Sequence, residues 1–355
     1  MTTTMTSASA YFRQYCAIGL DDRIVMPTLM QAMHQIVPSN FNVFWWAGES
    51  GEVSGFHTEN PNAIPAAKRY MSEFANKREM KSVSMSFGQH VKQHNVRNAA
   101  QLGSALFESD FYQELLKPVG IRTLLRASVK PTGRPGGSVM LTRAPGERPF
   151  SAADERRLES VLPYLAHALA APRDTGQIEY ADCGDQVGML IVSLQGKVEF
   201  ANEQGRLFLR LAQGSEADEL EVFARLTRAV QALDAIQRGT AAPPPAFRLH
   251  NASGVFQFRC YNMESTTSTA RLACVWITRL VPKAIKQLAT IQTFGLPHRL
   301  TEYCAALARG LSHSEASRLM GISLHTGKSY FDSIRDKLGV ASREELLKRI
   351  QSDNP

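Results

Sequence analysis

The apolar positions follow three different patterns along the chain of 355 residues. Residues 41–46 form an apolar and aromatic run, which predicts a buried strand. From residue 189 to 200, an apolar run, a Gln-Gly turn and an alternating run follow one another, as in two strands joined by a tight turn. After residue 283, apolar residues recur every three or four positions, which indicates helices. We therefore expect two or three domains.

Four short helices are predicted from residue 295 onward. The first carries apolar residues at positions i, i+3, i+4 and i+7, namely Leu300, Tyr303, Cys304 and Leu307. The second and fourth open with Ser312 and Ser342, each three residues before a glutamate, which is the pattern of a capping box. Ser323 is placed to cap the third helix, which we expect to reach Leu338. Only three residues separate the second helix from the third, and this arrangement is typical of a helix-turn-helix.

An amphipathic stretch at 283–294 precedes these helices, with Ile285, Leu288 and Ile291 at every third position. We expect a helix whose apolar stripe either packs on its own domain or pairs with a second copy of the chain.

Gly327 lies one turn into the third helix, where glycine costs about 1 kcal/mol relative to alanine. It shares a face with Phe331, Ile334 and Leu338, so this face is predicted to point inward. Either the glycine allows a close approach to the preceding helix, or Met320 fills the space. The outward face then carries the candidate DNA contacts His325, Thr326, Lys328, Ser329, Asp332 and Arg335. The alternative is an all-α interaction domain without a DNA role.

The charge favours a polyanionic partner. The net charge is +7 and the pI is about 9.2. From residue 281 to the end, Lys and Arg outnumber Asp and Glu by 11 to 7, so a large share of the basic surplus lies in the predicted helix-turn-helix region.

Residues 296–348, which include ARGLSHSEASRLMGISLHTGKSYFDSIRDKLGVASREELLK, resemble the LuxR-type helix-turn-helix module. The match contains the family's A-x-G-L-S and K-L-G-V-x-S-R patterns and has no gap. The resemblance implies a four-helix module that dimerises and reads the major groove. It places Lys328 at the position of the family's groove-entering lysine, and it matches Arg343 to the arginine that follows the third helix.

Several residues depart from the family pattern. Pro297 and Leu300 replace the residues that cap the first helix, Gly327 replaces a branched apolar residue, and Tyr330 stands where histidine is common. Asp332 adds a negative charge that either accepts a hydrogen bond from cytosine or repels phosphate. These changes leave the DNA target open.

Two further resemblances concern the rest of the chain. The stretch GMLIVSLQGKVEFANEQGRLFL, in which Asn202 is placed to cap a helix, resembles the start of a PAS domain, and strand-like runs follow at 247–250, 255–261 and 271–278. His250 is the sole histidine of this PAS-like unit, and we expect it at the surface rather than as a haem ligand. In the N-terminal unit, a Gly-rich turn at 132–138 between two strands and a helix capped by Ser151 resemble the closing half of a GAF-type domain.

Two pairs of residues in the N-terminal unit each have two possible roles. Trp45 and Trp46 point to opposite sides of a strand, so both pack in the core, or one lines a pocket. His90 and His94 have the spacing of two metal ligands on a helix, although a solvated face is the expected reading.

No motif predicts catalysis, a metal site or a cofactor, so the chain is not expected to be an enzyme, and its ligand-binding residues stay unknown. The five scattered cysteines favour a reducing compartment. Neither a signal peptide nor a membrane span is predicted, so we expect a cytoplasmic protein.

The expected fold is multidomain: a GAF-like α+β sensor domain at 1–172, a PAS-like α+β sensor domain at 177–280, a linker helix at 281–294 and an all-α four-helix LuxR-type domain at 295–355. The expected function is sequence-specific transcription regulation by a homodimer on double-stranded DNA, with a small-molecule effector and RNA polymerase as further candidate partners. The alternative is a dimeric sensor-scaffold that acts through protein contacts.

Overall fold

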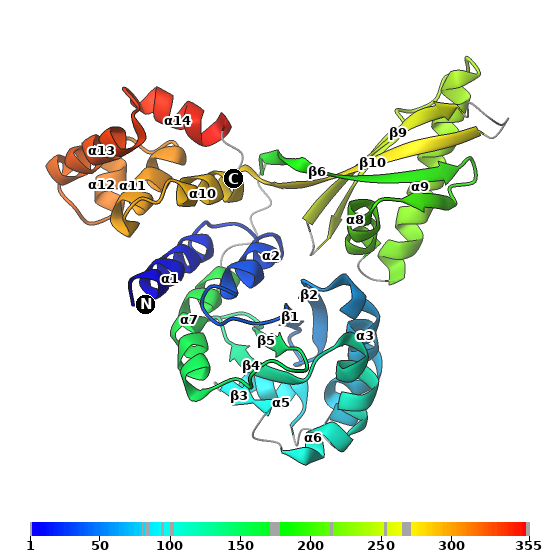
Figure 1. The fold of residues 1–355 in the computed structure, drawn as a ribbon, viewed down its shortest axis with the longest axis horizontal. Coiled ribbons are helices and arrows are strands. Elements are labelled where there is room, and N and C mark those ends of the chain that lie inside the picture. The colour runs from blue at the N-terminus through cyan, green and yellow to red at the C-terminus, as the bar shows by residue number, and fades with distance from the viewer. Residues whose placement is uncertain are drawn as a thin grey trace.

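A computed structural model describes residues 2–79, 81, 85–93, 96–99, 103–170, 178–213, 216–251, 254–264 and 271–352. The chain folds as two α+β units, each with a five-stranded antiparallel sheet, followed by a helical segment (Figure 1).

The first sheet has the order β2-β1-β5-β4-β3. Its strands are β1 (Asn42–Ala47), β2 (Val53–Thr58), β3 (Val96–Asn98), β4 (Thr123–Val129) and β5 (Gly137–Arg143). One face packs on α1 (Thr2–Cys16), α2 (Asp22–Met33) and α7 (Ala152–Ala170). The other face is covered by the short segments η1 (Pro61–Ala63), α3 (Ile64–Arg69), η2 (Tyr70–Arg78), α5 (Phe87–Lys92), α6 (Ser104–Glu108), η4 (Tyr112–Leu116) and η5 (Lys117–Val119).

The adjacent tryptophans of β1 lie on opposite faces of this sheet. Trp46 belongs to the core under α1, α2 and α7, and its Nε1 donates to Asp22 Oδ2 at 2.7 Å. Trp45 belongs to the opposite core and packs against Tyr70 with ring centroids 4.6 Å apart. Both are buried, which confirms the prediction of opposite sides and of core packing.

The second sheet has the equivalent order, β7-β6-β10-β9-β8. Its strands are β6 (Tyr180–Ser193), β7 (Val198–Ala201), β8 (Ala246–Asn251), β9 (Gly254–Glu264) and β10 (Arg271–Pro282). Helices α8 (Glu203–Gln213) and α9 (Glu216–Gln237) cover one face. Asn202 Oδ1 accepts from Gly205 N at 2.6 Å, which confirms the predicted helix cap.

The uncovered face of the second sheet exposes large apolar side chains. Trp276 on β10 pairs with Met189 on β6, and their side chains are 44% and 39% exposed. The ring of Tyr261 on β9 lies 5.3 Å from the ring of Trp276. Phe200 and Met263 extend this apolar sheet face to its edges. Contiguous exposed apolar side chains of this kind are typical of contact surfaces.

The C-terminal segment consists of α10 (Lys283–Thr293), α11 (His298–Ala308), α12 (His313–Leu319), α13 (Leu324–Leu338) and α14 (Arg343–Ser352). Tyr303, Cys304, Leu307, Ile334 and Leu346 form the centre of their shared core. All four helices expected after residue 295 are present: α12, α13 and α14 begin at serine caps, whereas α11 begins at Pro297 without a side-chain cap and is held by its apolar stripe.

Helix α10 joins the C-terminal helices to the N-terminal unit. Ile285 and Leu288 pack in the core under α1, α2 and α7, whereas Ile291 packs in the C-terminal core. Ile291 thus packs on the helices that follow it, which is one of the two alternatives predicted from the sequence, whereas Ile285 and Leu288 pack on the N-terminal unit, which neither alternative named. Arg13 on α1 also forms an ion pair with Glu302 on α11.

The linker differs from the prediction at its start. Strand β10 continues past a register shift to Pro282, and Lys283 N then donates to Glu179 O at 2.8 Å, so the helix begins at 283 rather than 281. The boundary expected between 172 and 177 falls outside the described residues. Among the described helices, none is long and apolar enough to cross a membrane.

Candidate nucleic-acid interface and interior sites

Serine caps fix the start of both helices in the α12–α13 pair. Ser312 Oγ accepts from Glu315 N at 3.2 Å while Glu315 Oε2 accepts from Ser312 N at 2.8 Å, which completes the predicted capping box. Ser323 Oγ accepts from Thr326 N at 3.0 Å. Gly321 between them has a φ of 64°, which glycine adopts without strain. The chain thus reverses within a few residues.

Gly327 lies where α13 crosses α11 and α12. A β-carbon at this position would lie 2.1 Å from Ser317 Oγ and 2.9 Å from Tyr303 Oη. Tyr303 is fully buried and donates to or accepts from His313 Nδ1 at 2.9 Å, so it is held in place. Close approach therefore explains the glycine, which was one of the two alternatives.

The predicted DNA contacts on α13 lie together on its outer surface. Four of them are exposed: His325, Lys328, Ser329 and Asp332. Thr326 and Arg335 are half-buried, and Arg335 Nη1 lies 3.6 Å from Asp332 Oδ1. This ion pair partly neutralises the negative charge that Asp332 adds to the surface.

Charges of α13 and α14 meet around His313 at the start of α12. Burial lowers the pKa of His313, Arg343 and Lys328 lower it further, and Asp332 opposes them. The lowered pKa favours the neutral form of His313 near pH 7, so this side chain adds little positive charge to the surface.

Arg343 takes a different place from the other predicted contacts. It is half-buried at the start of α14, and its Nη2 donates to Leu307 O at 3.4 Å. In this arrangement its guanidinium braces α14 against the end of α11.

A buried polar network in the first unit was not found from the sequence. Glu79 accepts from Arg126 Nη1 at 2.7 Å and from Tyr70 Oη at 2.9 Å. Arg126 Nε donates to Ser138 Oγ, which lies 3.1 Å from His90 Nε2. These residues are far apart in the sequence and polar, so no local pattern connects them.

The network borders a small cavity of about 40 Å³, lined in part by Trp45, Tyr70, Phe111, Arg126 and Met140. This volume suits a water molecule or two.

His90 is buried rather than on a solvated face, so that expectation was wrong: Phe87 and Val91 of α5 pack in the core against the sheet, and His90 faces Ser138 of β5. His94 lies outside the described residues. No cluster of three metal-ligating side chains occurs among the residues that were described. His250 is exposed, as predicted.

Comparison with known proteins gives only weak similarities. No family model and no curated protein matches the chain. One solved structure is the VqmA dimer of Vibrio cholerae, a LuxR-type receptor; the match has 18% identity, covers 46% of this chain and 81% of that one, and has a TM-score of 0.18. Another is the E. coli DhaR(N)-DhaL complex, with 14% identity, 78% and 90% coverage and a TM-score of 0.26. At these TM-scores neither match carries an argument.

Proposed function

We propose that the protein is a sequence-specific DNA-binding transcription regulator. The observation that carries the proposal is the α12–turn–α13 pair, in which Gly327 permits close packing while Lys328 and its neighbours remain exposed. Together with the LuxR-type sequence pattern, this arrangement favours α13 as the helix that enters the major groove. The protein acts as a binding protein in the cytoplasm rather than as an enzyme, and RNA polymerase is a further partner of its DNA complex.

The two α+β units serve as sensors in this proposal, the first GAF-like and the second PAS-like. The order of strand, turn, strand and Asn202-capped helix supports the second assignment. The strand hairpin and the Ser151-capped α7 support the first: Ser151 Oγ lies 3.3 Å from Asp154 N. An effector shifts the DNA-binding module only as far as it binds one arrangement more tightly than another.

Lys328→Ala tests the recognition surface. We expect the variant to lose the sequence preference of the wild type, because the ammonium group is exposed at the centre of the outer face of α13. Bound duplexes selected from a random DNA pool at near-physiological salt provide the measurement. The matched control is Lys197→Ala, which removes an exposed lysine from the second unit.

A two-fold motif recovered with the wild type and the control but not with Lys328→Ala supports a dimeric DNA reader. An unchanged motif with Lys328→Ala contradicts the assignment of α13. Binding without any motif and without salt dependence favours the alternative, a sensor-scaffold, because phosphate contacts release counterions and a protein interface need not.

A further inference from the structure

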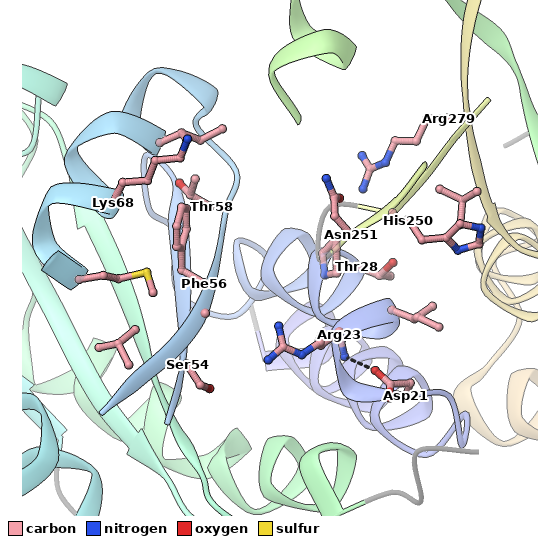
Figure 2. Close-up of a pocket in the computed structure, with 18 of the residues that line it drawn as sticks. Asp21, Arg23, Thr28, Ser54, Phe56, Thr58, Lys68, His250, Asn251 and Arg279 are labelled. Atoms are coloured by element: carbon pink, nitrogen blue, oxygen red, sulfur yellow. Dashed lines mark hydrogen bonds between the residues drawn. The ribbon is translucent and has the colours of Figure 1, made fainter. Parts of the chain in front are cut away.

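A cleft of about 1300 Å³ separates the two sheet-containing units (Figure 2). One wall comes from α2, β2 and α3, and the other from the end of β8, the start of β9 and the end of β10. Ile285 of α10 lines the same cleft. It is a separate space from the small aromatic cavity of the first unit.

Cationic side chains enter the cleft from both walls. Lys68 projects from α3, Arg23 from α2 and Arg279 from β10, and Figure 2 shows all three beside the open space. Each is half-buried. They come from three elements that are distant in the sequence, so the fold itself gathers these charges.

Basic residues outnumber acidic ones in the lining: Arg23, Lys68, Arg69 and Arg279 stand against Asp21 and Glu73. Asp21 uses its carboxylate to cap α2, accepting from Arg23 N at 2.9 Å. Glu73 pairs with Arg69, which also pairs with Glu114. The positive charge of Arg279 also acts on the first unit: burial and this arginine together lower the pKa of His57 on β2 to about 3. The cleft thus favours negative charge.

Apolar side chains form the remainder of the walls. They include Ile24, Pro27, Val53, Phe56, Met71 and Leu280. Polar groups are present as well, among them Thr28, Ser54 and Thr58. A mainly apolar surface with a few placed charges is typical of small-molecule sites, and these lie preferentially between domains.

We propose that this cleft binds a small organic anion with an apolar body, its carboxylate or phosphate attracted by the positive charge that Arg23, Lys68 and Arg279 bring to the lining. The apolar body contacts Phe56 and its neighbours. Because the two walls belong to different units, the bound anion joins them. If the proposed regulatory function holds, the effect reaches the DNA-binding helices through Ile285 and α10, and this part of the inference rests on that function.

The test uses the full chain and two anionic probes, octanoate and phenyl phosphate, in calorimetric titrations. Octanol and inorganic phosphate serve as the halves of these probes. We expect saturable binding of at least one anionic probe, tighter than either half. Lys68→Ala and Arg279→Ala should each weaken it about tenfold, since each removes a positive charge from the lining of a partly buried cleft. Arg206→Ala, an exposed arginine of α8 outside the cleft, should leave it unchanged.

Three results would overturn the proposal: no saturable binding of either probe, equal binding of octanol, or binding that survives both cleft variants. No hydrogen bond or ion pair of the Lys68 side chain is described, and its carbonyl oxygen, which accepts from Ser72 Oγ, is kept in Lys68→Ala, so this variant tests the site with little effect on the fold. DNA binding of the same samples is measured separately. Anion binding without DNA binding retains the cleft and rejects the regulator, whereas the reverse rejects the cleft alone.

Discussion

At the scale of single residues, the absence of a side chain at Gly327 sets how closely three helices approach. The backbone of α13 lies against Ser317 and the buried ring of Tyr303, and no β-carbon fits there. The helix accepts the propensity cost of glycine because the packing gain is larger.

Gly327→Ala should destabilise the protein by up to about 2 kcal/mol, because overpacking costs about 1–3 kcal/mol and the gain in helix propensity offsets about 1 kcal/mol. Urea unfolding measures the change. Ser329→Ala on the exposed face is the control and should stay within about 0.5 kcal/mol. A more stable Gly327→Ala variant would show that the contact of α13 with α11 and α12 has space for a β-carbon.

His34 gives the first unit a pH-dependent contribution. Its Nε2 lies 2.8 Å from Glu59 Oε2, and this hydrogen bond raises the pKa of His34 above 6.5. The protonated pair therefore stabilises the fold below about pH 6.5, and this contribution is lost as the pH rises through the raised pKa.

Glu59→Gln should lower the pKa of His34 and flatten the pH dependence of stability in this window. Glutamine keeps an acceptor for Asn42 N, which donates to Glu59 in the wild type. NMR titration of the His34 ring and unfolding at several pH values give the two readouts. An unchanged pKa of His34 in Glu59→Gln would mean that Glu59 does not stabilise the protonated imidazole of His34.

At the scale of elements, what the sequence predicts depends on whether the signal is local. The caps at Ser312 and Ser323 and the strand at 41–46 were predicted because a few adjacent residues determine them. Helices α1, α2 and α9 were not predicted, and neither was the Glu79 network. The polar, Thr- and Ser-rich start of α1 has no helical signature, and this helix is held by tertiary contacts with α2 and α7.

The candidate surface on α13 could be predicted for the same reason: a helix of known start fixes which residues share a face. The packing of Arg343 against Leu307 and the cation-lined cleft could not, because both depend on how distant elements meet.

Arg13→Glu should loosen the contact between α1 and α11 by placing two carboxylates together. We expect faster hydrogen exchange in both helices and a loss of global stability of about 1 kcal/mol or less, since the pair is partly exposed. Arg13→Glu combined with Glu302→Arg should restore slow exchange. If the single variant exchanges like the wild type, the ion pair does not hold these helices together.

At the scale of the whole molecule, the apolar sheet face of the second unit is a candidate interface for the expected homodimer. A two-fold axis brings the same surface of both copies together, and an exposed apolar sheet face that carries Trp276 is suited to that symmetry.

Trp276→Glu should shift the protein toward the monomer, because it buries a charge at the centre of the proposed interface. Sedimentation velocity measures the change. The control is Ile236→Glu on α9, since Ile236 is equally exposed at 44% but lies away from the sheet face. A dimer that tolerates the glutamate at 276 uses another surface, and a wild-type monomer removes the two-fold model.

The direct junction of β10 and α10 makes the linker act as a lever. Pro282 ends the strand and Lys283 begins the helix, so no slack residue separates sheet from helix. The 11 residues of α10 span about 16 Å. A tilt of roughly 10° at the sheet therefore displaces the far end of α10 by about 3 Å. In a dimer that binds half-sites one DNA turn apart, a displacement of this size decides whether the two copies of α13 match the spacing of the half-sites.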